Sequence, residues 1–202
     1  MVRLDKFLAE MGKGTRSEIK KYIKQGRVKV NDKVVKSSDL KIDADTCIVT
    51  FDDIKVVYEE YVYYMLNKPK GVVSATSDNR SKTVIDIISD DDRRRDLFPM
   101  GRLDIDTTGL LIISNDGELS HRLLSPRFHV DKCYYAVVEG IVNEDDVNTL
   151  KEPVDIGIGG AIELTMPAAL EIISVSADKS EIYLTISEGK YHQVKRMMAK
   201  LN

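Results

Sequence analysis

The chain has 202 residues and a net charge of −3, with 43% hydrophobic and 31% charged residues. These proportions are ordinary for a globular protein and exclude a disordered or collagen-like chain. Its two cysteines, Cys47 and Cys133, lie far apart without C-x-x-C spacing, which argues against a disulfide framework or a zinc site. The N-terminus is not typical of a secretion signal, and there is no apolar run of about 18 residues. We therefore expect a cytoplasmic protein that does not enter a membrane.

Positive charge is concentrated near the N-terminus. Residues 1–41 hold 12 Lys and Arg against five Asp and Glu, whereas the remaining residues hold 18 against 28. Contacts of Lys and Arg with phosphates supply most of the sequence-independent affinity for nucleic acid. The basic segment is therefore the place to expect a polyanion, and the acidic remainder by itself gives no such indication.

Two helices and a hairpin are predicted in this basic segment. Apolar residues at helical spacing predict a first helix over residues 4–11, which ends at Gly12. A second helix begins at Thr15, which can form a capping box with Glu18, and it stops at Gly26. Short alternating strands then flank the polar turn of residues 31–33 and predict a hairpin.

The rest of the chain is rich in strand patterns. We expect a domain boundary near residues 53–60, so that residues 1–58 form one domain and residues 59–202 another. Strands are predicted over residues 61–67, 110–114, 133–140, 169–176 and 181–187, and helices over residues 118–124, 144–150 and 191–200. Because the helices do not alternate regularly with the strands, the second domain is predicted to be α+β on a mainly antiparallel sheet. No P-loop, G-x-G-x-x-G or G-x-S-x-G motif is present.

The segment GRLDIDTTGLL, residues 101–111, places carboxylates in a polar turn directly before an apolar strand. Such a turn is where an enzyme would keep a reactive acid. From the residues alone the acid is Asp104, Asp106 or Asp116, and Asp116 is more simply explained as a turn or helix-cap residue.

This segment resembles the catalytic motif of the small-subunit rRNA pseudouridine synthase A family. Three further segments resemble motifs of the same family: MLNKPKG at residues 65–71, the K-x-Y pattern at residues 132–134, and ISEGKYHQVKRM at residues 186–197. The basic N-terminal segment resembles the S4 RNA-binding domain. The resemblance runs from about Arg3 to the end of the chain and implies an S4 domain followed by a pseudouridine synthase domain.

The resemblance implies three catalytic residues and neither a cofactor nor a metal ion. Asp104 would be the nucleophile or the acid/base. Tyr134 would pack on the target base and assist removal of the C5 proton, although a tyrosine beside Tyr135 would otherwise be read as core. Lys195 would pair with Asp104 where many relatives carry arginine, and a lysine there is a point charge rather than a bidentate fork.

Basic residues of both domains are expected to contact RNA. Arg102 would meet the RNA backbone or fill the space left by a flipped base, and a plain surface ion pair is the alternative. The full set of expected RNA contacts is Arg3, Arg16, Lys20, Lys24, Arg27, Lys68, Arg102 and Arg196.

The resemblance is closest to enzymes that modify 16S small-subunit rRNA. The partner is expected to be this rRNA, either naked or in a partly assembled ribosomal particle. The chain is expected to act as a monomer. A 23S large-subunit rRNA synthase and an inactive rRNA-binding assembly factor are the alternatives. Glycoside hydrolysis by Asp104 and Asp106 is poorly supported, because residues two apart on an extended segment point opposite ways. Family members continue past the last helix, so we expect a C-terminally incomplete chain at Asn202.

Overall fold

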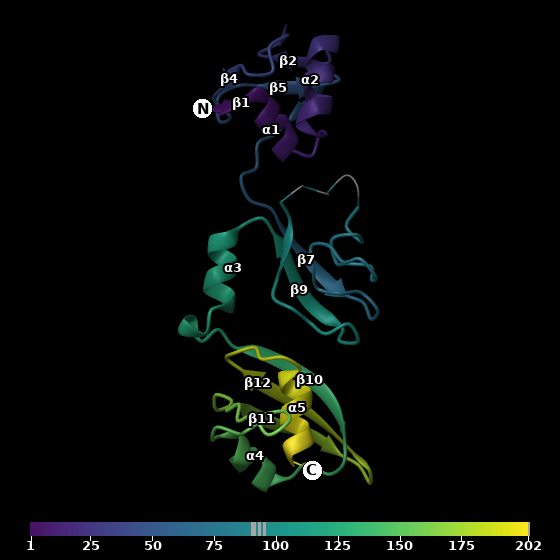
Figure 1. Cartoon of the computed structure of the whole chain (residues 1–202), viewed down its shortest axis with the longest axis vertical. Helices are drawn as coiled ribbons and strands as arrows, with labels where there is room; N and C mark the ends of the chain where they lie inside the picture. The colour runs from purple at the N-terminus through teal and green to yellow at the C-terminus, as the bar shows by residue number, and fades with distance from the viewer. Residues whose placement is uncertain (90–91, 93, 95, 202) are drawn as a thin grey trace. The chain divides into compact units, whose positions relative to one another are not determined.

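The computed structural model describes residues 1–89, 92, 94 and 96–201 (Figure 1). The terminal Asn202, at which the chain was expected to be cut, lies outside these residues. Two compact units divide the chain, Met1–Gly117 and Glu118–Asn202. The first unit holds two separate hydrophobic cores, one built from residues 2–58 and one from residues 62–113. The expected division into functional domains at residues 58 and 59 stays a prediction.

Residues 1–58, which we call the N-terminal module, begin with the two predicted helices. They are α1 (Leu4–Glu10) and α2 (Arg16–Gln25). Thr15 and Glu18 form the expected capping box, and Gly26 ends α2 with a left-handed φ of 85° that suits a residue without a Cβ. Ile19 and Ile23 of α2 are fully buried against α1, so the apolar stripes predicted from helical spacing form this core.

The strands of the N-terminal module form two small antiparallel sheets. They are β1 (Val2–Arg3), β2 (Val28–Val30), β3 (Lys33–Val34), β4 (Lys41–Ile42), β5 (Val49–Phe51) and β6 (Ile54–Val56). Strand β1 pairs with β4, and the other four follow the order β3-β2-β5-β6. Asn31 and Asp32 both have positive φ in the two-residue turn between β2 and β3, which confirms the predicted hairpin.

The rest of the first unit is built on a three-stranded antiparallel sheet. Its strands are β7 (Tyr63–Lys68), β8 (Phe98–Met100) and β9 (Gly109–Ser114), in the order β7-β9-β8. Strand β7 alternates between exposed and half-buried side chains and ends at the buried Lys68, and β9 buries Leu111 and Ile113 in the core. In the register of this sheet Lys68, the last residue of β7, lies opposite Gly109, the first residue of β9. The polar turn with Asp104 thus leads into the central strand.

The second unit contains a three-stranded antiparallel sheet in the order β10-β12-β11. Its elements are α3 (Gly117–Leu124), the 3₁₀ helix η1 (Pro126–Phe128), β10 (Lys132–Glu139), α4 (Glu144–Leu150), β11 (Ala169–Val175), β12 (Lys179–Ile186) and α5 (Gln193–Leu201). Leu150 of α4 and Met197 of α5 share one core with Ile182 and Leu184 of β12, so both helices pack on the same sheet (Figure 1). The predicted α+β class with antiparallel sheets is confirmed.

Helix α5 begins two residues later than the sequence predicted. The expected helix started at Tyr191, whereas the observed helix starts at Gln193. His192 has a left-handed φ of 48°, which an α-helix cannot contain. Among the described residues, no helix is long and apolar enough to cross a membrane.

Candidate active site

Asp104 is half-buried in a loop whose backbone is held from several sides. The amide of Thr107 donates to the carbonyl of Asp104 at 3.1 Å, which closes a tight turn. The Ser74 hydroxyl donates to the carbonyl of Leu103 at 2.9 Å and accepts from the amide of Leu103 at 3.1 Å. The amide of Gly71 donates to the carbonyl of Ile105 at 2.8 Å. Both of these partners follow β7, so Gly71 of the MLNKPKG segment and the nearby Ser74 hold the backbone around Asp104.

Lys68 lies in a different environment from the one expected of an RNA contact. Its side chain has no exposed surface, and its ammonium group donates to the carbonyls of Pro69, Ile105 and Thr107 at 3.0, 3.4 and 2.9 Å. A buried ammonium with three backbone acceptors has no surface to offer a phosphate. The structure gives the expected RNA contact of Lys68 no support, and we place the residue among the groups that hold the Asp104 loop. Arg102, in contrast, is exposed.

The two rival carboxylates have different surroundings. Asp106 is exposed in the same loop as Asp104. Asp116 accepts a hydrogen bond of 2.7 Å from the hydroxyl of Tyr63, and its amide donates to the hydroxyl of Ser114 at 3.0 Å. These contacts are those of a turn residue at the end of β9, in agreement with the sequence interpretation of Asp116.

We predict that Asp116→Asn changes the titration of Tyr63 and leaves catalysis intact. The hydrogen bond to Asp116 raises the pKa of Tyr63 to about 12, and loss of the carboxylate charge should lower it toward about 10. Because the neutral hydroxyl of Tyr63 is the donor, the bond stabilises the folded protein at pH values below the unfolded-state pKa of Tyr63. This stabilisation is lost as the pH rises through the folded-state pKa. Ultraviolet absorbance titration, with Tyr63→Phe identifying the transition, measures the shift. A large loss of activity in Asp116→Asn would contradict the assignment.

Tyr134 lies on β10 in the second unit, opposite Leu184 of β12. It is half-buried and packs on the core that contains Met197 of α5, whereas Tyr135 is 56% exposed. Alternation along the strand thus turns the two tyrosines to opposite faces. The tyrosine of the K-x-Y motif therefore faces the core, and its neighbour faces solvent.

Lys195 is exposed on the first turn of α5, and a buried polar cluster fixes the start of this helix. Gln193 is 4% exposed, and its side chain accepts from the amide of Lys190 at 2.8 Å and donates to Glu188 at 2.9 Å. The Glu188 carboxylate also accepts from the amide of Met166 at 2.7 Å. The sequence analysis missed this cluster, although two polar residues beside an apolar helix stripe were visible in the motif.

Arg196 has intramolecular partners where an RNA contact was expected. Its guanidinium donates to the carbonyls of Ile156 and Tyr191 and forms an ion pair with Glu163. The side chain is only 14% exposed. An RNA phosphate would have to displace these acceptors, so we leave Arg196 out of the proposed RNA surface.

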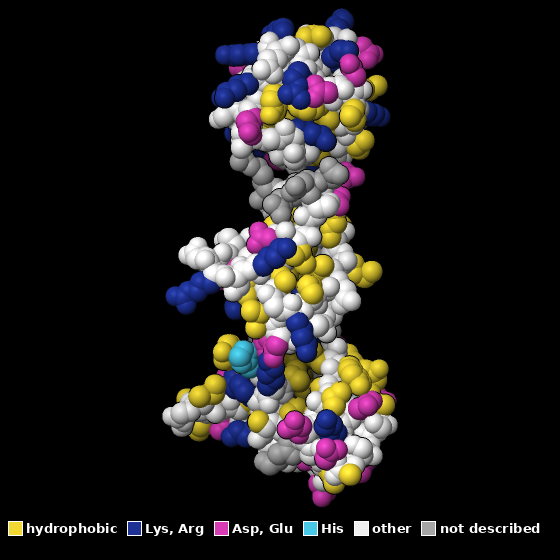
Figure 2. Space-filling model, turned by 90° about the vertical axis from the view of Figure 1, so that its right-hand side faces the viewer, with side chains coloured by type: hydrophobic (Ala, Val, Ile, Leu, Met, Phe, Trp, Pro, Cys, Tyr) yellow, Lys and Arg dark blue, Asp and Glu magenta, His cyan; other side chains and the backbone are white. Residues whose placement is uncertain are grey.

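Three of the expected RNA contacts in the N-terminal module are exposed on α2. They are Arg16, Lys20 and Lys24. Figure 2 shows Lys and Arg side chains spread over the surface of this module with a few carboxylates between them. The face of α2 that does not pack on α1 is therefore open to a polyanion.

Arg27 is held by its neighbours. Its guanidinium forms an ion pair with Asp52 and lies over the rings of Tyr22 and Phe51, 4.3 and 4.8 Å from their centroids. The hydrogen bond from Arg27 lowers the pKa of Asp52. This engagement leaves Arg27 less positive charge to offer to RNA than Arg16, Lys20 or Lys24.

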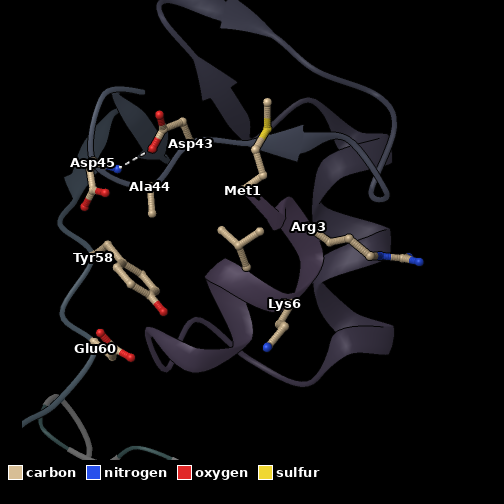
Figure 3. Close-up of a pocket in the computed structure, with 9 residues that line it drawn as sticks. Met1, Arg3, Lys6, Asp43, Ala44, Asp45, Tyr58 and Glu60 are labelled. Carbon is tan, nitrogen blue, oxygen red and sulfur yellow. Dashed lines mark hydrogen bonds between the residues drawn. The ribbon is translucent and has the colours of Figure 1, made fainter.

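A pocket formed by the N-terminal module together with Glu60 is lined by more acidic than basic side chains (Figure 3). Asp43, Asp45 and Glu60 contribute carboxylates, and Lys6 contributes an ammonium group. Figure 3 shows the guanidinium of Arg3 directed away from the pocket, and Arg3 pairs with Asp5 at 3.0 Å. An acidic lining is unfavourable for phosphate, so this pocket is not our candidate for RNA.

Asp104 belongs to the first unit, and Tyr134 and Lys195 belong to the second. The surroundings of each candidate residue are therefore described within its own unit. Within the described parts of the chain, no three His, Cys, Asp or Glu side chains are grouped so that they could hold a metal ion.

Two family models match the chain. Residues 62–200 match the model of RNA pseudouridylate synthase, and residues 2–46 match that of the S4 domain. Among solved structures, one described as a crystal structure of pseudouridylate synthase is 40% identical, with a TM-score of 0.60, and the match covers 100% of this chain and 84% of the other.

Known proteins match over nearly the whole chain. An uncharacterized RNA pseudouridine synthase of Bacillus subtilis is 45% identical over 97% of this chain and 81% of its own length. A ribosomal small subunit pseudouridine synthase A of Haemophilus influenzae is 42% identical over 99% of this chain and 83% of its own. A ribosomal large subunit pseudouridine synthase B of Bacillus subtilis is 38% identical over 98% and 79%. The resemblance inferred from the motifs is confirmed.

Proposed function

We propose that this chain, which belongs to the RNA pseudouridylate synthase family, converts one uridine of 16S small-subunit rRNA to pseudouridine. The observation that carries the proposal is the pair of family matches, an S4 domain followed by a synthase domain. The choice of small-subunit rRNA is supported by the identity of 42% to the small subunit enzyme of Haemophilus influenzae.

The reaction rearranges one nucleotide without changing its formula. The bond between N1 of uracil and C1′ of ribose breaks, the base turns, and C5 forms a new bond to C1′. The hydrogen at C5 leaves as a proton, and N1 gains one. No electrons are exchanged with a partner, so the reaction itself needs a nucleophile or an acid/base and no redox group.

We assign these steps to three residues. The Asp104 carboxylate attacks the nucleotide or removes a proton from the sugar. Tyr134 packs on the target base and assists loss of the C5 proton. Lys195 pairs with Asp104 and keeps the carboxylate charged and oriented. The assignment is supported by the four motifs of the sequence and by the ordered backbone around Asp104 and at the start of α5.

Docking on RNA is assigned to residues 1–58 and chemistry to residues 59–202. The open basic face of α2, with Arg16, Lys20 and Lys24, supports this division. Arg102 is a further candidate contact beside Asp104. Because the proposed substrate is ribosomal, we also propose a cytoplasmic enzyme that acts as a monomer on rRNA or on a partly assembled ribosomal particle.

We predict that replacing Arg16, Lys20 and Lys24 together by glutamine weakens rRNA binding mainly at low salt. Each lost phosphate contact should reduce the slope of log affinity against log salt by about 0.7 to 0.9. The slope should therefore fall by about 2 to 3. Filter binding or fluorescence anisotropy over a salt series measures it.

The matched control replaces three exposed lysines outside the N-terminal module, Lys82, Lys151 and Lys179. It removes the same charge and should change the slope less. Equal slopes for the two triple variants would show that the effect is one of overall charge and would remove α2 from the docking surface.

The substrate is tested by release of tritium from C5-labelled uridine. Small-subunit and large-subunit rRNA are each offered as naked transcript and as assembly intermediate. Release from small-subunit rRNA alone is expected. Release from large-subunit rRNA alone would favour the alternative suggested by the likeness to the large subunit enzyme of Bacillus subtilis, and no release from any substrate would favour an inactive RNA-binding factor.

A further inference from the structure

Lys68 is a buried charge that the proposed chemistry leaves without a task. It ends strand β7, in which Tyr64 and Leu66 face the same core. Side chains two residues apart share a face of a strand, so the alternation of β7 sends Lys68 inward as well. A lysine rarely occupies a fully buried position unless its ammonium is paired or hydrogen-bonded. The position therefore calls for an explanation.

The contacts of Lys68 converge on the loop that carries Asp104. Two of its three acceptors, the carbonyls of Ile105 and Thr107, lie one and three residues beyond Asp104. Three acceptors use the three N–H donors that only the protonated form supplies. The lysine is thus held as a cation by the same loop that it fixes.

The other loop contacts are uncharged. The Ser74 hydroxyl and the Gly71 amide also hold this loop. Burial lowers the pKa of Lys68, and the negative charges of Asp106 and Asp104 act in the opposite direction. Among these loop contacts Lys68 is therefore the one that supplies positive charge.

We propose that Lys68 is a positioning residue for the catalytic aspartate, which it serves by fixing the turn that follows Asp104 and by supplying a buried positive charge to its loop. The inference rests on the proposed role of Asp104. The proposal gives two cations separate roles. Lys195 contacts the carboxylate in the proposed chemistry, whereas Lys68 acts from within the core, through its hydrogen bonds to the backbone and through the electrostatic field of its charge. Asp106 is the other charged group of the loop that acts on Lys68.

The test compares Lys68→Met with Lys70→Met, both in the folded enzyme. Methionine has a similar volume but no charge, and Lys70 is an exposed lysine two residues away. Tritium release is measured from pH 5 to pH 9. In Lys68→Met we expect kcat to fall at least tenfold, KM for rRNA to change less than twofold, and the acid limb of the profile to move to higher pH, because a positive charge beside the carboxylates of this loop is lost. Lys70→Met should keep both kcat and the acid limb.

A merely structural lysine would behave differently. Its loss would reduce the fraction of folded enzyme and leave the acid limb of the remaining activity in place, and that result would overturn the proposal. An activity of Lys68→Met equal to that of Lys70→Met would overturn it as well.

A second measurement needs no substrate. Hydrogen exchange of the amides of residues 104–107 is compared in the folded variants, and these amides should exchange faster in Lys68→Met than in the wild type and in Lys70→Met. Unchanged exchange in this loop overturns the proposal. If the wild type releases no tritium, the proposed function fails, while this comparison still decides whether Lys68 fixes the turn after Asp104.

Lys68→Arg covers the case in which Lys68→Met does not fold. Arginine keeps the charge but presents its donors in a different geometry. We expect the acid limb to stay in place and kcat to fall at least threefold, because the turn after Asp104 is reset. A folded Lys68→Arg enzyme with full kcat, or one with a shifted acid limb, would count against the proposal.

Discussion

Asp104→Asn abolishes tritium release from rRNA, with an expected loss on the order of 10³-fold or more, as is found when a residue that acts covalently or as an acid/base is removed. Asparagine has nearly the same shape but cannot act as a nucleophilic carboxylate or take up a proton at neutral pH. The backbone contacts around the residue, such as those of Ser74 with Leu103, do not involve the carboxylate. The variant should therefore fold and bind rRNA as the wild type does.

The matched control for this prediction is Asp106→Asn in the same loop. Asp106 is exposed, and substitutions at the surface usually change the free energy of unfolding by less than about 0.5 kcal/mol. The Asp106→Asn variant should therefore fold, and its activity should fall by no more than about threefold. Tritium release, circular dichroism and rRNA binding are measured on both variants. If Asp106→Asn were the inactive one, the assignment within GRLDIDTTGLL would have to move by two residues.

Glu188→Ala should destabilise the second unit by about 2 to 4 kcal/mol, because a buried carboxylate is removed from partners that remain buried. The amide of Met166 and the side chain of Gln193 both lose their acceptor. The Lys190 ammonium, 3.1 Å from Glu188, loses its ion pair. The first turn of α5, which carries Lys195, should loosen more than the rest of the unit.

Hydrogen exchange measures this local effect, and thermal unfolding measures the overall loss. Amides of residues 188–198 should exchange faster in Glu188→Ala, while those of β10 change less. Glu188→Gln keeps an acceptor oxygen, and its stability should lie between those of the wild type and Glu188→Ala. The control Glu171→Ala removes an exposed glutamate from β11 and should stay within about 0.5 kcal/mol of the wild type. Equal stability of Glu188→Ala and Glu171→Ala would contradict the role of the cluster.

The local elements of the fold could be predicted because they follow from short-range patterns. The capping box of Thr15 and Glu18 and the hairpin turn at Asn31 and Asp32 depend on residues within a few positions of each other. The opposite faces of Tyr134 and Tyr135 follow from strand alternation alone. The same alternation in β7 contained the signal that Lys68 faces the core, although the sequence analysis placed Lys68 among the expected RNA contacts.

By itself, the sequence determined the order of most helices and strands, the family, and the candidate residues Asp104, Tyr134 and Lys195. Only the tertiary structure decided which basic residues are engaged within the protein. Arg27 meets Asp52, and Arg196 meets Glu163, 25 and 33 residues away in the chain. An ion pair between distant residues leaves no periodic pattern in the sequence, so it depends on which segments the fold brings together. The acceptors of Lys68 in the Asp104 loop were decided in the same way, by the pairing of β7 with β9.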